Sequence, residues 1–300
     1  MTNPATPTTL ASPVPTRIGP ATFHWGSRTY VMGIVNATPD SFSGDGLLGG
    51  GGDPVEGALR LARQMAAEGA DLLDVGGEST RPGHEPVAAE EELERVVPVV
   101  AALRAALPGM PLSVDTTKAV VAEAALVAGA DMINDIWGVG PDDSLARLAA
   151  RRHVPMVVMH NRAEPRYDAL LPEMIADLAA ALDRAVRLGV PREALIVDPG
   201  FGFGKTPEQN LAIVRGLAGL RVLGRPILLG TSRKSTLGLV LDLPADGRLE
   251  ATLATTALGI AGGADLVRVH DVRANVRAAR VSDAIVRANW RTNVMQGGPG

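Results

Sequence analysis

The sequence predicts an α/β fold, a single (β/α)8 TIM barrel with a disordered N-terminal tail. Eight short apolar or β-branched runs alternate with eight amphipathic segments rich in alanine, leucine and arginine, the pattern of repeated βα units. No linker divides the central block of this 300-residue chain, and 46% hydrophobic residues can form a large core. An open, doubly wound sheet is the alternative fold.

Each expected element has bounds in the sequence. The strands should span residues 30–36, 72–76, 112–115, 132–135, 156–160, 195–198, 227–230 and 266–270. The helices that follow them should span residues 54–68, 90–107, 117–128, 143–152, 172–189, 207–218, 249–262 and 271–290. Asp53 and Thr206 stand in capping-box order before two of these helices. A Gly-Ala-Asp triplet at 69–71, 129–131 and 263–265 precedes three strands, and its glycine suits a left-handed helix end.

Composition limits the organisation and the partners of the chain. Residues 1–20 hold five prolines and are expected to form a disordered tail, residues 21–295 the barrel, and residues 296–300 a frayed end. A net charge of −4 argues against nucleic-acid and membrane partners. The chain has no cysteine, and neither a signal peptide nor a spanning segment is visible. A cytoplasmic protein is therefore expected.

Polar side chains stand where each apolar run ends. Strand ends of a closed barrel meet at one mouth, so these residues are the candidates for function. They are Asn36, Asp74, Glu78, Asp115, Asn134, Asp135, His160, Asp198, Ser232 to Lys234, Arg268 and His270. A single aspartate at such a position is more often a turn residue, but a complete set of eight polar strand ends indicates a site.

The lysines stand out because the chain has only three of them against 26 arginines. Lys118, Lys205 and Lys234 each follow an expected strand, where a compact ammonium differs from a planar guanidinium. We interpret Lys118 as a helix-surface residue and Lys234 as the functional one. Lys205 lies in the segment Gly-Phe-Gly-Phe-Gly-Lys-Thr at 200–206, which is not a nucleotide P-loop because Pro199 stands where a P-loop has its first glycine. Residues 38–53 and 76–85 are glycine-rich or polar loops that suit lids.

Several motifs make the chain similar to the dihydropteroate synthase family. They are Met-Gly-Ile-Val-Asn-Ala-Thr-Pro-Asp-Ser-Phe-Ser at 32–43, Asp-Val-Gly-Gly-Glu-Ser-Thr-Arg-Pro-Gly at 74–83, Ser-Val-Asp-Thr at 113–116, Ile-Asn-Asp at 133–135, Asp-Pro-Gly-Phe-Gly-Phe-Gly-Lys at 198–205, Thr-Ser-Arg-Lys-Ser at 231–235 and Arg-Val-His-Asp at 268–271. The segment after the fifth strand, residues 159–165, looks shorter than is usual for the family.

The resemblance implies a transferase that condenses 6-hydroxymethyl-7,8-dihydropterin diphosphate with p-aminobenzoate, in folate biosynthesis. It implies a pterin site formed by Asp115, Asn134, Asp198 and Lys234, and a diphosphate site formed by Arg268, His270 and Mg²⁺ bound to Asn36. The p-aminobenzoate slot would contain Pro82, Phe203, Lys234 and Ser235, with Thr80 and Arg81 carried on a lid. Catalytic roles would fall to Asn36, Asp115, Lys234, Arg268 and His270. A homodimer and a role as a sulfonamide target are further expectations from the family.

Two rival functions stay open on the sequence alone. Methyltetrahydrofolate-to-corrinoid methyltransferases use a related pterin-binding barrel, but they are not expected to carry the segment at 36–43 or the pair Arg268 and His270. A catalytically silent pterin-binding homologue is the second rival, since fold does not imply function. Pyrophosphate release from the two substrates would distinguish both rivals from a synthase.

Overall fold

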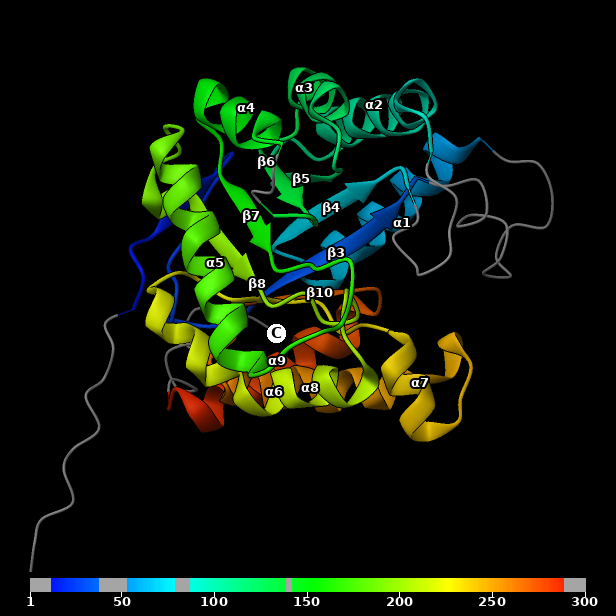
Figure 1. Cartoon of the computed structure of the whole chain (residues 1–300). Coiled ribbons are helices and arrows are strands. Elements are labelled where there is room, and N and C mark those ends of the chain that lie inside the picture. Colours follow the sequence, from blue (N-terminus) through cyan, green and yellow to red (C-terminus); the bar gives the residue numbers. More distant parts are fainter. Residues whose placement is uncertain (1–11, 38–52, 79–86, 139–141, 289–300) are drawn as a thin grey trace, which may run out of the picture.

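The computed structural model describes residues 12–37, 53–78, 87–138 and 142–288, and its ribbon is a barrel of parallel strands surrounded by helices (Figure 1). The barrel strands are β3 (Tyr30–Asn36), β4 (Leu72–Gly76), β5 (Leu112–Asp115), β6 (Met132–Asp135), β7 (Met156–Met159), β8 (Leu195–Asp198), β9 (Leu228–Leu229) and β10 (Leu266–Val269). They pair in the order β8-β7-β6-β5-β4-β3-β10-β9, and a parallel bridge between Val197 and Ile227 closes the ring. The predicted TIM barrel is confirmed.

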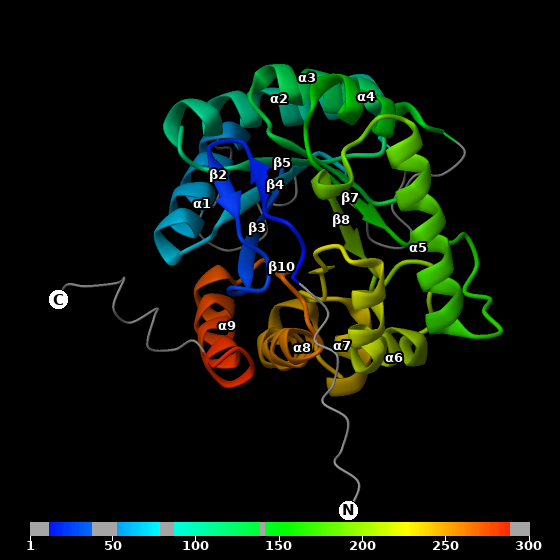
Figure 2. The ribbon, with the colours of Figure 1, turned by 90° about the vertical axis from the view of Figure 1, so that its left-hand side faces the viewer.

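The helices form an outer layer around the strands (Figure 2). They are α1 (Pro54–Glu68), α2 (Ala89–Ala106), α3 (Ala119–Ala128), α4 (Ser144–Arg152), α5 (Leu170–Arg187), α6 (Pro207–Gly216), α7 (Ser235–Leu241), α8 (Leu249–Ala261) and α9 (Val272–Val286), with short 3-10 turns η2 (Arg192–Ala194), η3 (Leu217–Leu223) and η4 (Ala245–Gly247). Sequence reasoning missed α7. The capping box at Thr206 is confirmed, whereas the Asp53 side chain accepts from Val55 N. None of the described helices has the length and apolarity to cross a bilayer.

Side chains inside the barrel change from apolar to polar along the strands. Successive residues of a strand point to opposite faces, so every second residue points inward. One apolar interior layer contains Met32, Leu72, Met132, Val157, Ile196, Leu228 and Leu266, all buried. Two residues further along their strands stand Asp74, Asn134, Asp198 and Arg268. The strand period therefore brings the predicted strand-end residues to one level of the barrel.

A β-hairpin, which the sequence reasoning missed, covers the opposite, apolar end of the barrel (Figure 2). Its strands are β1 (Thr16–Ile18) and β2 (Ala21–Phe23), and its side chains pack with the apolar interior layer. Thr16 Oγ1 accepts from Trp25 Nε1 and donates to Glu193 O. The prediction of a disordered tail up to residue 20 is therefore wrong from β1 onward, because burial of alternate residues outweighs the proline-rich composition. Residues 1–11 and the expected frayed end, 296–300, lie outside the described residues.

The three Gly-Ala-Asp triplets have a common structural role. Their glycines are left-handed as predicted, with φ of +99, +119 and +96 at Gly69, Gly129 and Gly263. The aspartates that follow accept from backbone N–H groups at the start of a neighbouring strand segment: Asp71 from Val31, Asp131 from Leu112, and Asp265 from Ile227. The repeat thus ends a helix and anchors the next strand to the one beside it.

The hairpin yields a stability prediction. Ile18 is fully buried and lies in the apolar layer, whereas Val14 is 60% exposed. Ile18→Ala should lower the free energy of unfolding by about 2–4 kcal/mol, because it removes buried methyl groups and leaves a cavity. Val14→Ala, the matched control, should change it by under about 0.5 kcal/mol. Urea unfolding of both variants measures the difference, and equal stabilities would show that the hairpin adds nothing to the barrel.

Candidate active site

An ion-pair network inside the polar half of the barrel forms the centre of the site. Arg268 Nε donates to Asp74 Oδ2 at 2.6 Å, and its Nη2 donates to Asp115 Oδ2 at 2.7 Å. Asn134 Nδ2 donates to the same Asp74 oxygen at 2.9 Å. Burying a guanidinium is costly unless carboxylates compensate its charge, and here strands β4 and β5 supply two of them. Asp74, to which the sequence reasoning gave no role, is the residue that links Arg268 to Asn134.

Two buried carboxyl groups of the site hold their protons unusually tightly. Burial raises the pKa of Asp115 to about 7, despite Arg268, and Asp74 adds to the effect. Burial raises the pKa of Asp198 to about 6, although the Gly200 N–H and Lys234 oppose it. Asp115 Oδ1 and Asp74 Oδ1 are buried without a hydrogen-bond partner in the described structure. Buried oxygens of this kind normally have a partner, so the network has spare acceptors for a ligand with N–H groups.

Lys234 faces these carboxylates from the loop after β9. Burial and Arg268 lower its pKa to about 8, while Asp198 and Asp115 favour the charged form. Its Nζ lies 3.9 Å from the centre of the Phe203 ring, a cation–π contact between two loops. The preceding residue, Arg233, has a left-handed backbone with φ +56 and pairs with Asp271 at 2.7 Å. Strain of this kind is maintained where the surroundings hold the chain, so the Arg233 pair fixes the loop that presents Lys234.

His270 and Asn36 occupy the ends of β10 and β3. Ser232 Oγ accepts from the His270 backbone N–H at 3.1 Å and lies 3.0 Å from its Nδ1, so the serine fixes the orientation of the imidazole. Asn36 is half-buried at the last position of β3, where it pairs in register with Gly76. Ser235 begins α7 directly after Lys234 and is exposed. Thr80, Arg81 and Pro82, and most of the two expected lids, lie outside the described residues.

Lys118 is not the helix-surface residue that we expected. Its Nζ bridges Glu78 at 2.5 Å and Glu92 at 2.6 Å, and the Glu92 side chain is 1% exposed. A buried carboxylate requires a cation beside it, which explains why lysine stands here in a chain that otherwise uses arginine. The sequence could not show this because Glu92 lies on α2, 26 residues away.

Among the described residues, no group of three or more histidine, aspartate or glutamate side chains could hold a metal ion by itself. Asn36 offers a single carboxamide oxygen, the type of neutral ligand that Mg²⁺ accepts when most of its other ligands are water or phosphate.

Comparison with known proteins agrees with this geometry. The model of the pterin binding enzyme family matches residues 32–270. The dihydropteroate synthase of Clostridium beijerinckii is 50% identical over 90% of this chain and 99% of its own. The Xanthomonas albilineans dihydropteroate synthase, solved with 4-aminobenzoic acid, is 43% identical, covers 86% of this chain and 93% of its own, and has a TM-score of 0.81. The Burkholderia cenocepacia enzyme complexed with 7,8-dihydropteroate is 41% identical, covers 93% and 99%, and has a TM-score of 0.82.

The fold and the site define a pterin-binding enzyme of the α/β-barrel class. More narrowly, the chain belongs to the family of dihydropteroate synthases.

Proposed function

We propose that this chain condenses 6-hydroxymethyl-7,8-dihydropterin diphosphate with p-aminobenzoate, giving 7,8-dihydropteroate and pyrophosphate. It is a transferase of folate biosynthesis. The observation that carries the proposal is the set of buried carboxyl groups with unpartnered oxygens beside Arg268 and Lys234. A pterin presents an amine and ring N–H donors next to a carbonyl acceptor, which complements this set.

The pterin ring fits the polar layer of the barrel. Asp115, Asn134 and Asp198 would pair with its donors, and the Lys234 ammonium with its carbonyl. Asp115, Asn134 and Asp198 stand on strand ends, which position them more firmly than loops could. An analogue that lacks the donors would leave buried carboxylates unpaired, so the site should discriminate steeply against it.

The reaction breaks the bond between the pterin methylene and the diphosphate oxygen. The amine lone pair of p-aminobenzoate then forms the new C–N bond, and the amine proton passes to solvent. Nε and Nη2 of Arg268 are committed to carboxylates in the described structure, so Nη1 would bind the departing diphosphate together with His270. Asp115 would stabilise the positive charge that develops on the pterin. No protein nucleophile takes part.

Magnesium would be held by Asn36 and the diphosphate, and it would neutralise negative charge on the leaving group. Because a single carboxamide binds weakly, the ion should not contribute to the stability of the free protein. We predict that excess EDTA abolishes turnover and leaves the melting temperature unchanged. Full turnover in the chelator would contradict the role of Asn36.

p-Aminobenzoate would occupy a slot formed by loop residues. Phe203, Lys234 and Ser235 line its inner part, with Pro82 on the second expected lid, where Thr80 and Arg81 would help to exclude water. The ring contact between Lys234 and Phe203 supports this placement, because it leaves an aromatic wall beside the pterin position.

We also propose a cytoplasmic homodimer. Exposed apolar side chains on the neighbouring helices α7, α8 and α9, among them Leu239, Val240, Leu258, Val281 and Ile285, form a surface suited to a second copy of the chain.

Lys234 provides the sharpest test of the site. Lys234→Ala should lose roughly 2–4 kcal/mol of transition-state stabilisation, about 30- to 1000-fold in kcat/KM. Lys234→Arg should be impaired as well, because the planar head is too wide for the site. Arg152→Ala, which removes an exposed cation paired with Glu123, is the control and should be unaffected. Coupled pyrophosphate release measures all three, and unimpaired Lys234 variants would rule out the assignment.

The raised carboxyl pKa values predict how pterin binding depends on pH. The carboxylate form of Asp198 accepts from the pterin, and it predominates only above its pKa of about 6. Affinity should therefore fall as the pH drops from about 7 to about 5, by up to tenfold per unit for each of the two carboxyl groups below its pKa. Asp198→Asn should bind more weakly and with a shallower dependence over this range, because one of the two titrating carboxyl groups is removed. Calorimetric titration with the dihydropterin diphosphate tests this, and a flat wild-type profile would refute it.

A further inference from the structure

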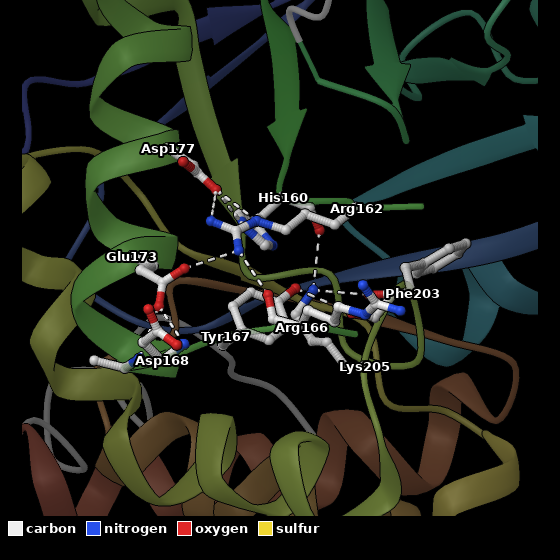
Figure 3. Close-up of polar contacts among 11 residues, drawn as sticks. His160, Arg162, Arg166, Tyr167, Asp168, Glu173, Asp177, Phe203 and Lys205 are labelled. Atoms are coloured by element: carbon white, nitrogen blue, oxygen red, sulfur yellow. Dashed lines mark hydrogen bonds and ion pairs between the residues drawn. The ribbon is translucent and has the colours of Figure 1, made fainter. Parts of the chain in front are cut away.

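The proposed reaction assigns no role to Lys205. Its Nζ donates to Phe203 O at 2.8 Å and to His160 O at 3.2 Å, so it joins two different loops. These are the strap, residues 160–169 between β7 and α5, and the 200–206 loop between β8 and α6 (Figure 3). Burial lowers the pKa of Lys205 to about 7, with Asp198 as the carboxylate that favours its charge. An ammonium in this position costs desolvation, which its bonds to two loops offset.

The strap is braced against α5 by Arg162. The guanidinium donates through Nη2 to Asp177 at 2.7 Å and through Nη1 to Glu173 at 2.9 Å. It also lies 4.5 Å from the centre of the Tyr167 ring, as Figure 3 shows. A planar fork that binds two carboxylates and stacks on an aromatic ring holds its segment in one arrangement.

The strap in turn contacts the backbone of the 200–206 loop. Tyr167 Oη donates to Gly204 O at 3.0 Å. Gly204 has φ +54, and a Cβ there would overlap the carbonyl of Arg162; a Cβ at Gly200 would overlap the carbonyl of His160. Both glycines are therefore required by the close approach of the two backbones. The 200–206 loop cannot shift away from the strap without losing the Tyr167 and Lys205 bonds.

Phe203 stands between these two attachment points. Its carbonyl accepts from Lys205, the next residue Gly204 accepts from Tyr167, and its ring contacts Lys234. We propose that Tyr167, Lys205 and Arg162 are positioning residues that set the depth of the Phe203 ring, and so determine how well p-aminobenzoate fits its slot. This inference rests on the proposed placement of p-aminobenzoate against Phe203. Wider aryl amines are disfavoured because the ring cannot retreat.

Tyrosine gives a matched pair of variants, since the chain has only Tyr30 and Tyr167. Tyr30 Oη accepts from His24 N at 2.8 Å, among the aromatic rings at the hairpin end of the barrel. Tyr167→Phe should raise the KM for p-aminobenzoate about threefold to tenfold, the value of one hydrogen bond, and leave the KM for the pterin diphosphate within about twofold. Tyr30→Phe should leave both unchanged. Equal changes in both KM values for Tyr167→Phe, or no change in either, would overturn the proposal.

Lys205→Met and a double variant test the route through Phe203. Lys205→Met should raise the KM for p-aminobenzoate about tenfold. Lys205→Arg should also have a raised KM, because the planar guanidinium is wider than the ammonium that bonds both carbonyls. In a Phe203→Ala background, Tyr167→Phe should have no further effect, since residues that act through one another are not additive. Full additivity would overturn the positioning role. If Phe203→Ala itself leaves the KM for p-aminobenzoate unchanged, the proposed placement of that substrate fails instead. Thermal melts of every variant separate these outcomes from loss of fold.

Discussion

The site depends on one guanidinium held inside a barrel. Arg268, on β10, lies between Asp74 of β4 and Asp115 of β5. These two residues come 194 and 153 positions before it in the chain. Asp198 brings the carboxyl groups at this level to three, against the two cations Arg268 and Lys234. Burial, which penalises the charged form, is the main reason why Asp115 and Asp198 retain protons so readily, and Asp74 adds to the effect at Asp115. A ligand rich in N–H donors would pair with these carboxyl groups, which the strands already hold in place.

The groups proposed for the two substrates come from different parts of the fold, strand ends for the pterin and loops for p-aminobenzoate. Asp115, Asn134 and Asp198, proposed for the pterin, stand at the ends of β5, β6 and β8; β5 and β6 pair with a strand on both sides, and β8 pairs with β7. Groups proposed for p-aminobenzoate stand on the 200–206 loop and on the loop that follows β9. A rigid inner site gives selectivity for a heterocycle, while outer loops tolerate variation. The strap, which Arg162 attaches to α5, is linked to the 200–206 loop through Tyr167 and Lys205.

Most of the barrel could be predicted from the sequence because each strand is a short apolar run that ends in a polar residue. The hairpin could not, since Thr16–Ile18 is three residues long among prolines, and only its burial against the barrel makes it a strand. The residues of the ion-pair network were each predicted as polar strand ends. Their pairing could not be predicted, because Asp74 and Arg268 are 194 positions apart in the sequence. Lysine scarcity correctly marked three special positions, yet for Lys118 the decisive neighbour, Glu92, was invisible to any local pattern.

The ring of strands is not equally strong all the way round. Between β8 and β9 it is closed by a single bridge, Val197 to Ile227, and β9 itself has two residues. The two loops that follow these strands carry Phe203 and Lys234, so the weakest seam of the barrel separates the two residues whose side chains touch. Backbone amides at this seam are the ones expected to exchange with solvent first. A substrate that binds both Asp198 and Lys234 would link β8 to the loop that follows β9. It would therefore stabilise the closure of the barrel at the place where the backbone pairing is weakest.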